Sequence, residues 1–172
     1  IFMKKSLGNK KQVMHVVSKK NIITNKWTTI VQEDFKNELG KDGSYLIVER
    51  QPALMIVPVI KKGDIVYTYL VKQYRYPIAK EVWQFPMGTL EENADPKEHA
   101  IKELREETGL QADTLSLVGN YYIDPGLSRQ QCNVYIAENI IEGGKQKLEE
   151  TEIGMVSQRF SLEELEKLIG EN

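Results

Sequence analysis

One stretch, residues 88–110 (GTLEENADPKEHAIKELREETGL), constrains the fold more than any other part of the chain. It predicts a helix from Pro96 to Thr108, because Asp95 suits the N-cap, proline suits the first helical position and Gly109 suits the C-terminal end. Helical spacing predicts one apolar side, formed by Ala100, Ile101 and Leu104.

Two acids of this helix, Glu106 and Glu107, lie three and four residues after a third, Glu103, and the three are therefore expected to share one face. Like charges at this spacing repel by about 0.2–0.5 kcal/mol per pair. A solvated surface helix tolerates that repulsion, with Lys102 and Arg105 diluting it, and this is one interpretation. The other is a hard divalent cation, since Mg²⁺ prefers oxygen ligands and is commonly shared with substrate phosphates.

The spacing resembles the Nudix box, G-x5-E-x7-R-E-U-x-E-E-x-G-U, in which U is aliphatic. The matching positions follow without a gap: Gly88, Glu103, Leu104, Glu106, Glu107, Gly109 and Leu110. Two positions depart, because the first box glutamate is Ala94 and the box arginine is Lys102. In the family those two side chains usually pair and brace the loop against the helix. The resemblance implies a Mg²⁺ or Mn²⁺ site on Glu103, Glu106 and Glu107, with the main-chain carbonyl of Met87 as a further ligand.

The segment 73–77 (QYRYP) resembles the one that precedes the box in ADP-ribose and nucleotide-sugar pyrophosphatases, and Pro125 lies at a distance after the box that is typical of that branch. The resemblance implies that Arg75 contacts the substrate phosphates, that Pro125 belongs to the substrate site, and that Tyr74, Tyr76 or Trp27 stacks on the base. Judged by the residues alone, Arg75 stacked on a tyrosine at an exposed edge and aromatic side chains in the core remain alternatives.

Residues 142–154 (EGGKQKLEETEIG) are acidic and contain glycines, which is typical of a surface loop. In the related enzymes an acid in such a loop acts as a base or a metal partner, and Glu149, Glu150 and Glu152 are the candidates here. The resemblance thus implies catalytic roles for Glu107, Glu150 and Glu152. In the segment before the box, Gln84 stands where the commonest family form has glutamate, so one outer acid is missing.

Alternating apolar and polar residues over 13–38 and 45–48 predict short antiparallel strands. Further strands are predicted over 53–60, 65–73, 115–122, 131–137 and 155–160, and a final helix is predicted after Ser161, with Glu164 in the capping-box position and Leu162, Leu165, Leu168 and Ile169 inward. Strands on both sides of one acidic helix predict a mixed sheet between helices, which matches the Nudix α/β/α sandwich. We expect an N-terminal β extension over residues 1–44, of the kind that dimerises related pyrophosphatases, and a Nudix domain over residues 45–172.

Composition excludes several function classes. A net charge of −2 gives no basic field for nucleic acid, and no apolar run reaches the roughly 20 residues that span a bilayer. The start of the chain carries no secretory signal. The lone Cys132 excludes an intrachain disulfide and is expected to be a buried, inert thiol, so a cytoplasmic location is predicted.

The leading hypothesis is Mg²⁺- or Mn²⁺-dependent hydrolysis of a nucleoside diphosphate sugar, with ADP-ribose first. One alternative is another nucleotide sugar such as GDP-mannose. Another is a nucleotide-binding or sensory Nudix domain with weak activity, which the departures at Gln84, Ala94 and Lys102 favour. His15 and His99 show no partner in the sequence, so both are expected to be structural.

Overall fold

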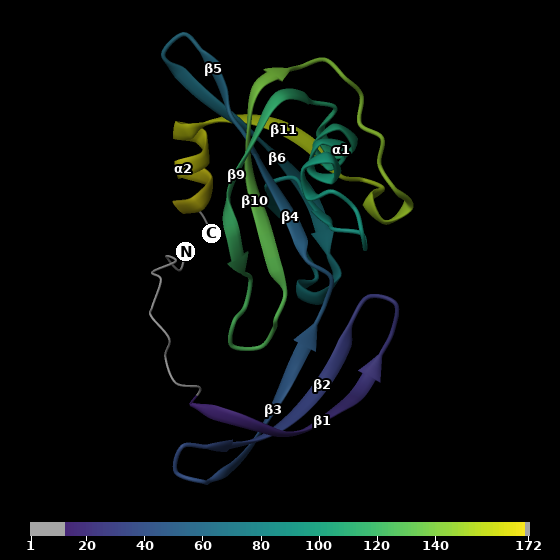
Figure 1. Ribbon diagram of the computed structural model, residues 1–172. Coiled ribbons are helices and arrows are strands. Elements are labelled where there is room, and N and C mark those ends of the chain that lie inside the picture. Colours follow the sequence, from purple (N-terminus) through teal and green to yellow (C-terminus); the bar gives the residue numbers. More distant parts are fainter. Residues whose placement is uncertain (1–12, 171–172) are drawn as a thin grey trace. The chain divides into compact units, whose positions relative to one another are not determined.

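The computed structural model describes residues 13–170, and their packing divides the chain into two compact units (Figure 1). Of these residues, the first unit contains 13–52 together with Tyr121–Gln131, and the second contains Ala53–Asn120 together with 132–170. The predicted division between residues 44 and 45 falls within a strand of the first unit.

The first unit is built on a three-stranded antiparallel sheet in the order β1-β2-β3, as expected for the N-terminal extension. Its strands are β1 (Met14–Thr24), β2 (Thr29–Asn37) and β3 (Asp42–Glu49). Side-chain caps set both turns: Asn25 Oδ1 accepts hydrogen bonds from the Trp27 and Thr28 amides, each 2.8 Å long. In the second turn Asn37 Oδ1 likewise accepts hydrogen bonds from the amides of Leu39 and Lys41. Such local bonding is why asparagine favours turns.

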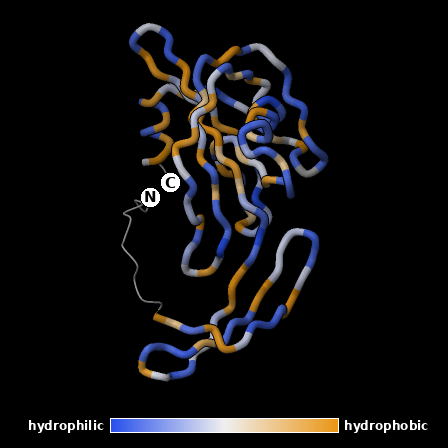
Figure 2. The backbone as a smooth tube through the Cα atoms, in the orientation of Figure 1, coloured by the Kyte–Doolittle hydropathy of each residue, from blue (hydrophilic) through white to orange (hydrophobic). Residues whose placement is uncertain are grey.

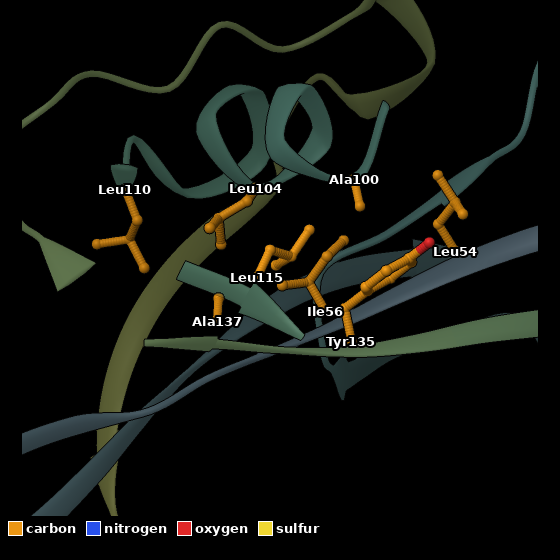
Figure 3. Packing of buried hydrophobic residues seen from close by; sticks show 8 residues of the cluster. All are labelled: Leu54, Ile56, Ala100, Leu104, Leu110, Leu115, Tyr135 and Ala137. Carbon is orange, nitrogen blue, oxygen red and sulfur yellow. The ribbon is translucent and has the colours of Figure 1, made fainter. Parts of the chain in front are cut away.

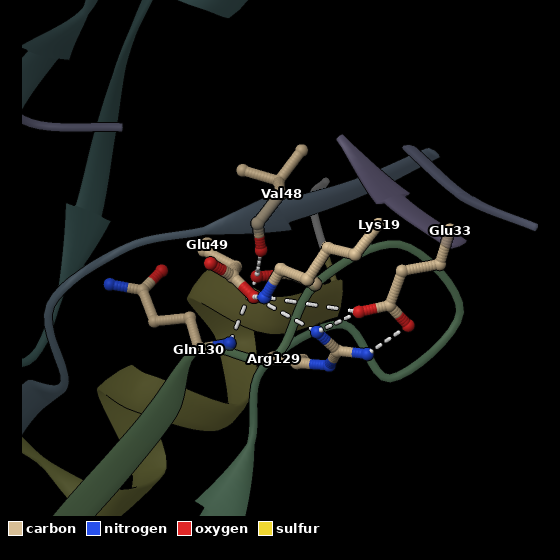
Figure 4. Close-up of polar contacts among 7 residues, drawn as sticks. Lys19, Glu33, Val48, Glu49, Arg129 and Gln130 are labelled. Carbon is tan, nitrogen blue, oxygen red and sulfur yellow. Dashed lines mark hydrogen bonds and ion pairs between the residues drawn. The ribbon is translucent and has the colours of Figure 1, made fainter. Parts of the chain in front are cut away.

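An ion network fastens the segment 121–131 to this sheet (Figure 4). The Arg129 guanidinium donates to both Glu33 oxygens, at 2.9 and 2.6 Å, and to Glu49 at 2.9 Å. Lys19 Nζ lies 3.2 Å from the same Glu49 oxygen. The hydrogen bond from Arg129 lowers the pKa of Glu33, so this buried carboxylate stays ionised.

The second unit holds two further sheets and both helices. One sheet runs β8-β4-β10-β9, with β4 parallel to β10 and antiparallel to β8, and the other runs β11-β6-β5, with β7 paired to β6. The predicted mixed sheet is therefore confirmed. The strands are β4 (Ala53–Pro58), β5 (Ile60–Lys62), β6 (Ile65–Arg75), β7 (Lys80–Gln84), β8 (Met87–Thr89), β9 (Gln111–Tyr122), β10 (Gln131–Ile141) and β11 (Val156–Ser161). The helices are α1 (Pro96–Thr108) and α2 (Leu162–Gly170), with two short 3-10 turns, η1 (Tyr76–Ile78) and η2 (Glu150–Glu152).

The core of the second unit lies where α1 packs on the first of these sheets (Figure 3). Its buried members are Leu54, Ile56, Ala100, Leu104, Leu110, Leu115, Tyr135 and Ala137. Burying one leucine side chain contributes roughly 1.5–3 kcal/mol, so this contact fixes α1 firmly. Ile101 was expected on the buried side, and that expectation is wrong: its side chain is 38% exposed. Figure 2 shows hydrophobic residues along the strands and mostly hydrophilic ones in the 142–154 loop.

The final helix begins with the predicted capping box. The Ser161 amide donates to Glu164 Oε2 at 2.7 Å, and the Glu164 amide donates to Ser161 Oγ at 3.2 Å. The expected inward face is wrong in part, because Leu162 is 49% and Ile169 is 70% exposed. Cys132 is a buried free thiol, as expected. Among residues 13–170, no helix has the length and apolar character to cross a membrane.

Candidate functional site

Helix α1 begins and ends as the sequence predicts. Asp95 Oδ1 accepts hydrogen bonds of 2.9 Å from the amides of Lys97 and Glu98. Gly109 adopts a left-handed φ of 73°, which favours glycine, and its amide donates to the Arg105 carbonyl at 2.9 Å. These caps fix the register of the helix, so its acids project at set positions.

Three carboxylates converge in the second unit: Glu103 and Glu107 of α1 and Glu152 of η2 each offer an oxygen, and these oxygens all lie within 4.8 Å of one another. The Glu107 side chain is almost fully buried. Glu106, the third acid predicted on the helix, is not in this group, and its carboxylate lies 3.7 Å from Lys102 Nζ. An all-carboxylate cluster is the donor set that Mg²⁺ or Mn²⁺ prefers.

One oxygen of each carboxylate in this cluster is fixed by a hydrogen bond. The Met87 amide donates to Glu107 Oε2 at 2.9 Å, and His99 Nε2 lies 2.9 Å from Glu103 Oε1. The amide of Glu149 donates to Glu152 Oε2 at 3.0 Å. Among the side chains that the structure describes, the other oxygen of each acid accepts no hydrogen bond, so each carboxylate keeps one oxygen that can bind a ligand.

Strand β8 brings the main chain against the acids. A Cβ added at Gly88 would overlap the Glu103 carboxylate carbon, so glycine is what lets Glu103 occupy its observed position. The neighbouring Met87 contributes its amide to Glu107, as described above. The role of its carbonyl as a metal ligand stays a prediction.

The electrostatics of the cluster favour a cation. Burial, and then the charges of Glu103 and Glu152, raise the pKa of Glu107 from 4.5 to about 8, although the Met87 amide and the Arg75 charge act in the opposite direction. Burial likewise raises the pKa of Glu103, while the hydrogen bond from His99 lowers it. Without a cation Glu107 therefore retains its proton at neutral pH, and a divalent ion would relieve the cost of ionising it.

His99 corrects the expectation that it has no partner. Its side chain is buried, one helical turn before Glu103, and its ring nitrogen lies against that carboxylate. The signal was present in the sequence, because residues four apart in a helix are neighbours.

The loop 142–154 reaches the cluster because it is anchored on the last turn of α1. The Gln146 side-chain amide donates to the Glu107 carbonyl at 2.5 Å, and the Lys147 amide donates to the Glu106 carbonyl at 2.8 Å. Gly144 approaches Gly109 so closely that a Cβ on either would strike the main chain of the other. The start of the loop is held separately.

That second anchor is Glu142, the first residue of the loop. Its carboxylate accepts hydrogen bonds from Tyr69 at 2.7 Å and Arg159 at 3.1 Å, and it pairs with Lys62. Burial, and then Glu142, raise the pKa of Tyr69 to about 12, so its hydroxyl remains a donor. Of the loop acids predicted to be catalytic, the fold brings Glu152 to the cluster, whereas Glu150 is exposed and outside it.

The predicted substrate-binding residues occupy both units. Arg75 ends β6, and its Nε and Nη2 donate to Gln84 Oε1 at 3.0 and 2.7 Å. Tyr74 and Tyr76 beside it are exposed. The remaining two candidates, Trp27 and Pro125, are exposed in the first unit, so their part in a substrate site stays a prediction.

Comparison with known proteins agrees with this geometry. The family model described as NUDIX domain matches residues 49–172. An ADP-ribose pyrophosphatase of Bacillus subtilis (strain 168) is 30% identical over 154 residues, which cover 89% of this chain and 81% of that protein. An ADP-ribose pyrophosphatase of Mycobacterium tuberculosis is 34% identical over 110 residues, covering 63% of this chain and 52% of that protein.

A solved structure described as "Crystal structure of ADP compounds hydrolase" superposes with a TM-score of 0.77 at 18% identity, covering 95% of this chain and 86% of that one. This likeness confirms the predicted fold. The family match spans most of the chain and contains both α1 and the loop that supplies Glu152. The chain therefore belongs to the NUDIX family of hydrolases.

Proposed function

We propose that the protein hydrolyses the pyrophosphate bond of a nucleoside diphosphate sugar with Mg²⁺ or Mn²⁺, and that ADP-ribose is its substrate, cleaved to AMP and ribose 5-phosphate. The observation that carries the proposal is the convergence of Glu103, Glu107 and Glu152 within 4.8 Å. The ADP-ribose pyrophosphatases among its relatives support the choice of substrate.

A divalent cation at these carboxylates would polarise phosphoryl oxygens and lower the pKa of a bound water. The chain itself orients the acids: His99 and the main-chain amides of Met87 and Glu149 each hold one carboxylate oxygen. The carbonyl of Met87 and the carboxylate of Glu106 are further proposed ligands. Pre-set ligand positions lower the cost of binding, because little has to reorganise.

The remaining roles follow from position and chemistry. Arg75 would neutralise the diphosphate through its planar fork. Glu152, already beside the helix acids, would orient or deprotonate the attacking water, and Glu150, exposed on the same turn, is the second candidate for that role. The stacking partner of the base is proposed among Tyr74, Tyr76 and Trp27, with Pro125 at the substrate site.

The test is a hydrolysis assay on a nucleotide-sugar panel with and without Mg²⁺, with products identified by chromatography. ADP-ribose should give AMP and ribose 5-phosphate only when the metal is present. Glu107→Gln should lose at least about 100-fold in kcat, because a buried neutral amide cannot replace the carboxylate. Glu98→Gln, an exposed change on the same helix, is the matched control and should retain activity. Metal-independent cleavage, or an active Glu107→Gln variant, contradicts the proposal.

Two alternatives have distinct outcomes in the same assay. Faster cleavage of GDP-mannose than of ADP-ribose would assign a different nucleotide sugar. Tight binding without turnover would assign a nucleotide-binding or sensory domain, which the altered brace at Ala94 and Lys102 favours. Because Ala94 offers no carboxylate, Lys102 cannot form the family's brace, and its ammonium group pairs with Glu106 on the same helix.

We further propose a cytoplasmic homodimer formed through the first unit. Strand β1 is an edge of its sheet and exposes apolar side chains along its length: Val16, Val17, Ile22 and Ile23. An exposed edge strand of this kind is prone to pair with another chain. Light scattering should give twice the monomer mass of 19.8 kDa, and replacing Val17 by lysine should reduce it.

A further inference from the structure

The Gln84 side chain binds Arg75 through a single atom, its amide oxygen. It ends β7, which runs antiparallel to β6, and Arg75 ends β6. Its Oε1 accepts both hydrogen bonds, 3.0 Å from Arg75 Nε and 2.7 Å from Nη2. A guanidinium group has only donors, so the amide must present its oxygen to Arg75 and turn its nitrogen away.

The side-chain nitrogen of Gln84, Nε2, is buried without a hydrogen-bond acceptor among residues 13–170. An unpaired buried donor destabilises a folded protein. A glutamate here would have no such donor and would form stronger, charge-assisted bonds to Arg75 through both oxygens. Packing and hydrogen bonding therefore favour glutamate, and the glutamine needs another explanation.

The difference between the two residues is charge. A glutamate would neutralise Arg75, whereas the glutamine holds the guanidinium and leaves its charge intact. Within the described chain Arg75 forms no ion pair with an acid, and its Nη1 makes no hydrogen bond. The charge acts on the acid cluster, since it lowers the pKa of Glu107 against the effect of burial.

We propose that Gln84 is a positioning residue that fixes the Arg75 guanidinium while keeping its positive charge uncompensated for an anionic diphosphate. This inference rests on the proposed function, because the diphosphate is that of the proposed substrate. It explains why this chain carries an amide where a carboxylate would pair better with its neighbour.

The test compares Glu and Met at position 84 with the unchanged protein. ADP binding in the presence of Mg²⁺ is measured by calorimetry, and KM and kcat are measured for ADP-ribose. Gln84→Glu should raise the Kd for ADP and the KM about tenfold, equivalent to about 1.4 kcal/mol. The kcat should change less than about threefold, because the loss is in ground-state binding. The thermal stability of this variant should be equal or higher.

Gln84→Met keeps the Arg75 charge and roughly the same volume but removes the acceptor, so it should weaken ADP binding less than Gln84→Glu does. Added salt should weaken ADP binding to the unchanged protein and affect Gln84→Glu less. Mn²⁺ affinity without nucleotide should be unchanged in Gln84→Glu.

A purely structural role predicts the opposite order, with Gln84→Glu harmless and Gln84→Met harmful, and that result overturns the proposal. Equal or tighter ADP binding by Gln84→Glu also overturns it. Failure of the unchanged protein to cleave ADP-ribose would remove the proposed function, yet the ADP-binding order would still decide the role of Gln84.

Discussion

His99 Nε2 lies 2.9 Å from Glu103 Oε1, one helical turn along α1, and both side chains are largely buried. The histidine fixes one oxygen of a carboxylate that lies in one cluster with those of Glu107 and Glu152. Outer partners of this kind typically change metal affinity 10–100-fold, roughly, when they are removed.

His99→Ala should therefore weaken Mn²⁺ binding by about tenfold, measured by calorimetry or by electron paramagnetic resonance. His99→Gln keeps a donor on the side chain and should recover part of the loss. His15→Ala changes the other histidine, which is exposed in the first unit, and should have no effect. Unchanged metal affinity in His99→Ala would show that the pair serves packing alone.

Gly88→Ala should abolish most activity while the protein still folds. The new methyl group would overlap the Glu103 carboxylate and displace it from its observed position in the cluster. We expect a decrease in kcat of at least about 100-fold, assayed beside a melting curve. Gly170→Ala is the control, because nothing lies within 4 Å of the added atom. Full activity in Gly88→Ala would mean that Glu103 is not required at its observed position.

Without metal, stability should fall as pH rises from about 5 to 8. The pKa of Glu107 is 4.5 in the unfolded chain and about 8 when folded, so the folded chain binds more protons than the unfolded chain in this window. Stability therefore decreases with rising pH, and the Tm in EDTA should drop by roughly 5 °C.

Mg²⁺ should restore the Tm, and most strongly near pH 8, because the ion and the Glu107 proton compete for the same carboxylate. Glu107→Gln should flatten the pH dependence in EDTA. Calorimetric melts at several pH values test both statements, and a Tm in EDTA that rises toward pH 8 would contradict the buried acid cluster.

Gln146→Ala should separate catalysis from stability. The change removes the hydrogen bond to the Glu107 carbonyl, so the loop that carries Glu152 loses one of its anchors. We expect kcat to fall about tenfold with a cost in stability of about 1 kcal/mol. Lys145→Ala, an exposed neighbour in the same loop, is the control and should behave like the unchanged protein.

In the first unit, acid should lower stability, whereas it stabilises the metal-free acid cluster of the second unit. Arg129 lowers the pKa of Glu33, so the stability this pair contributes is present above the ordinary value of 4.5 and is lost as pH falls below it. Hydrogen exchange of the β2 amides should accelerate in acid for this reason. Glu33→Gln should be less protected at neutral pH and less sensitive to acid, and an acid sensitivity equal to that of the unchanged protein would contradict this prediction.

Local signals in the sequence were sufficient for α1 and its caps, because the residues at Asp95, Pro96 and Gly109 act within one or two turns. Gly88 was identified by resemblance alone, and the close approach of Glu103 that explains it is visible only in the structure. Local signals failed for the exposed Ile101 and Ile169, since helical spacing shows which residues share a side but not how wide the covered stripe is.

The third member of the acid cluster could not be derived from spacing. Glu152 is distant in sequence from α1, and resemblance alone placed it among three candidates. The contact of the loop main chain with the end of α1, through Gly109 and Gly144, brings the loop to the helix, and the Glu149 amide holds the Glu152 carboxylate within it. Contacts of this kind involve backbone atoms and leave almost no trace in composition.

The joining of that loop to the helix terminus has a consequence for biosynthesis. The two helix acids emerge from the ribosome well before Glu152, and the sheet that carries the loop closes only when β11 pairs with β6. If the cluster holds the proposed ion, binding at full strength requires the completed fold, and truncated or partly folded copies should neither capture the metal nor consume nucleotide.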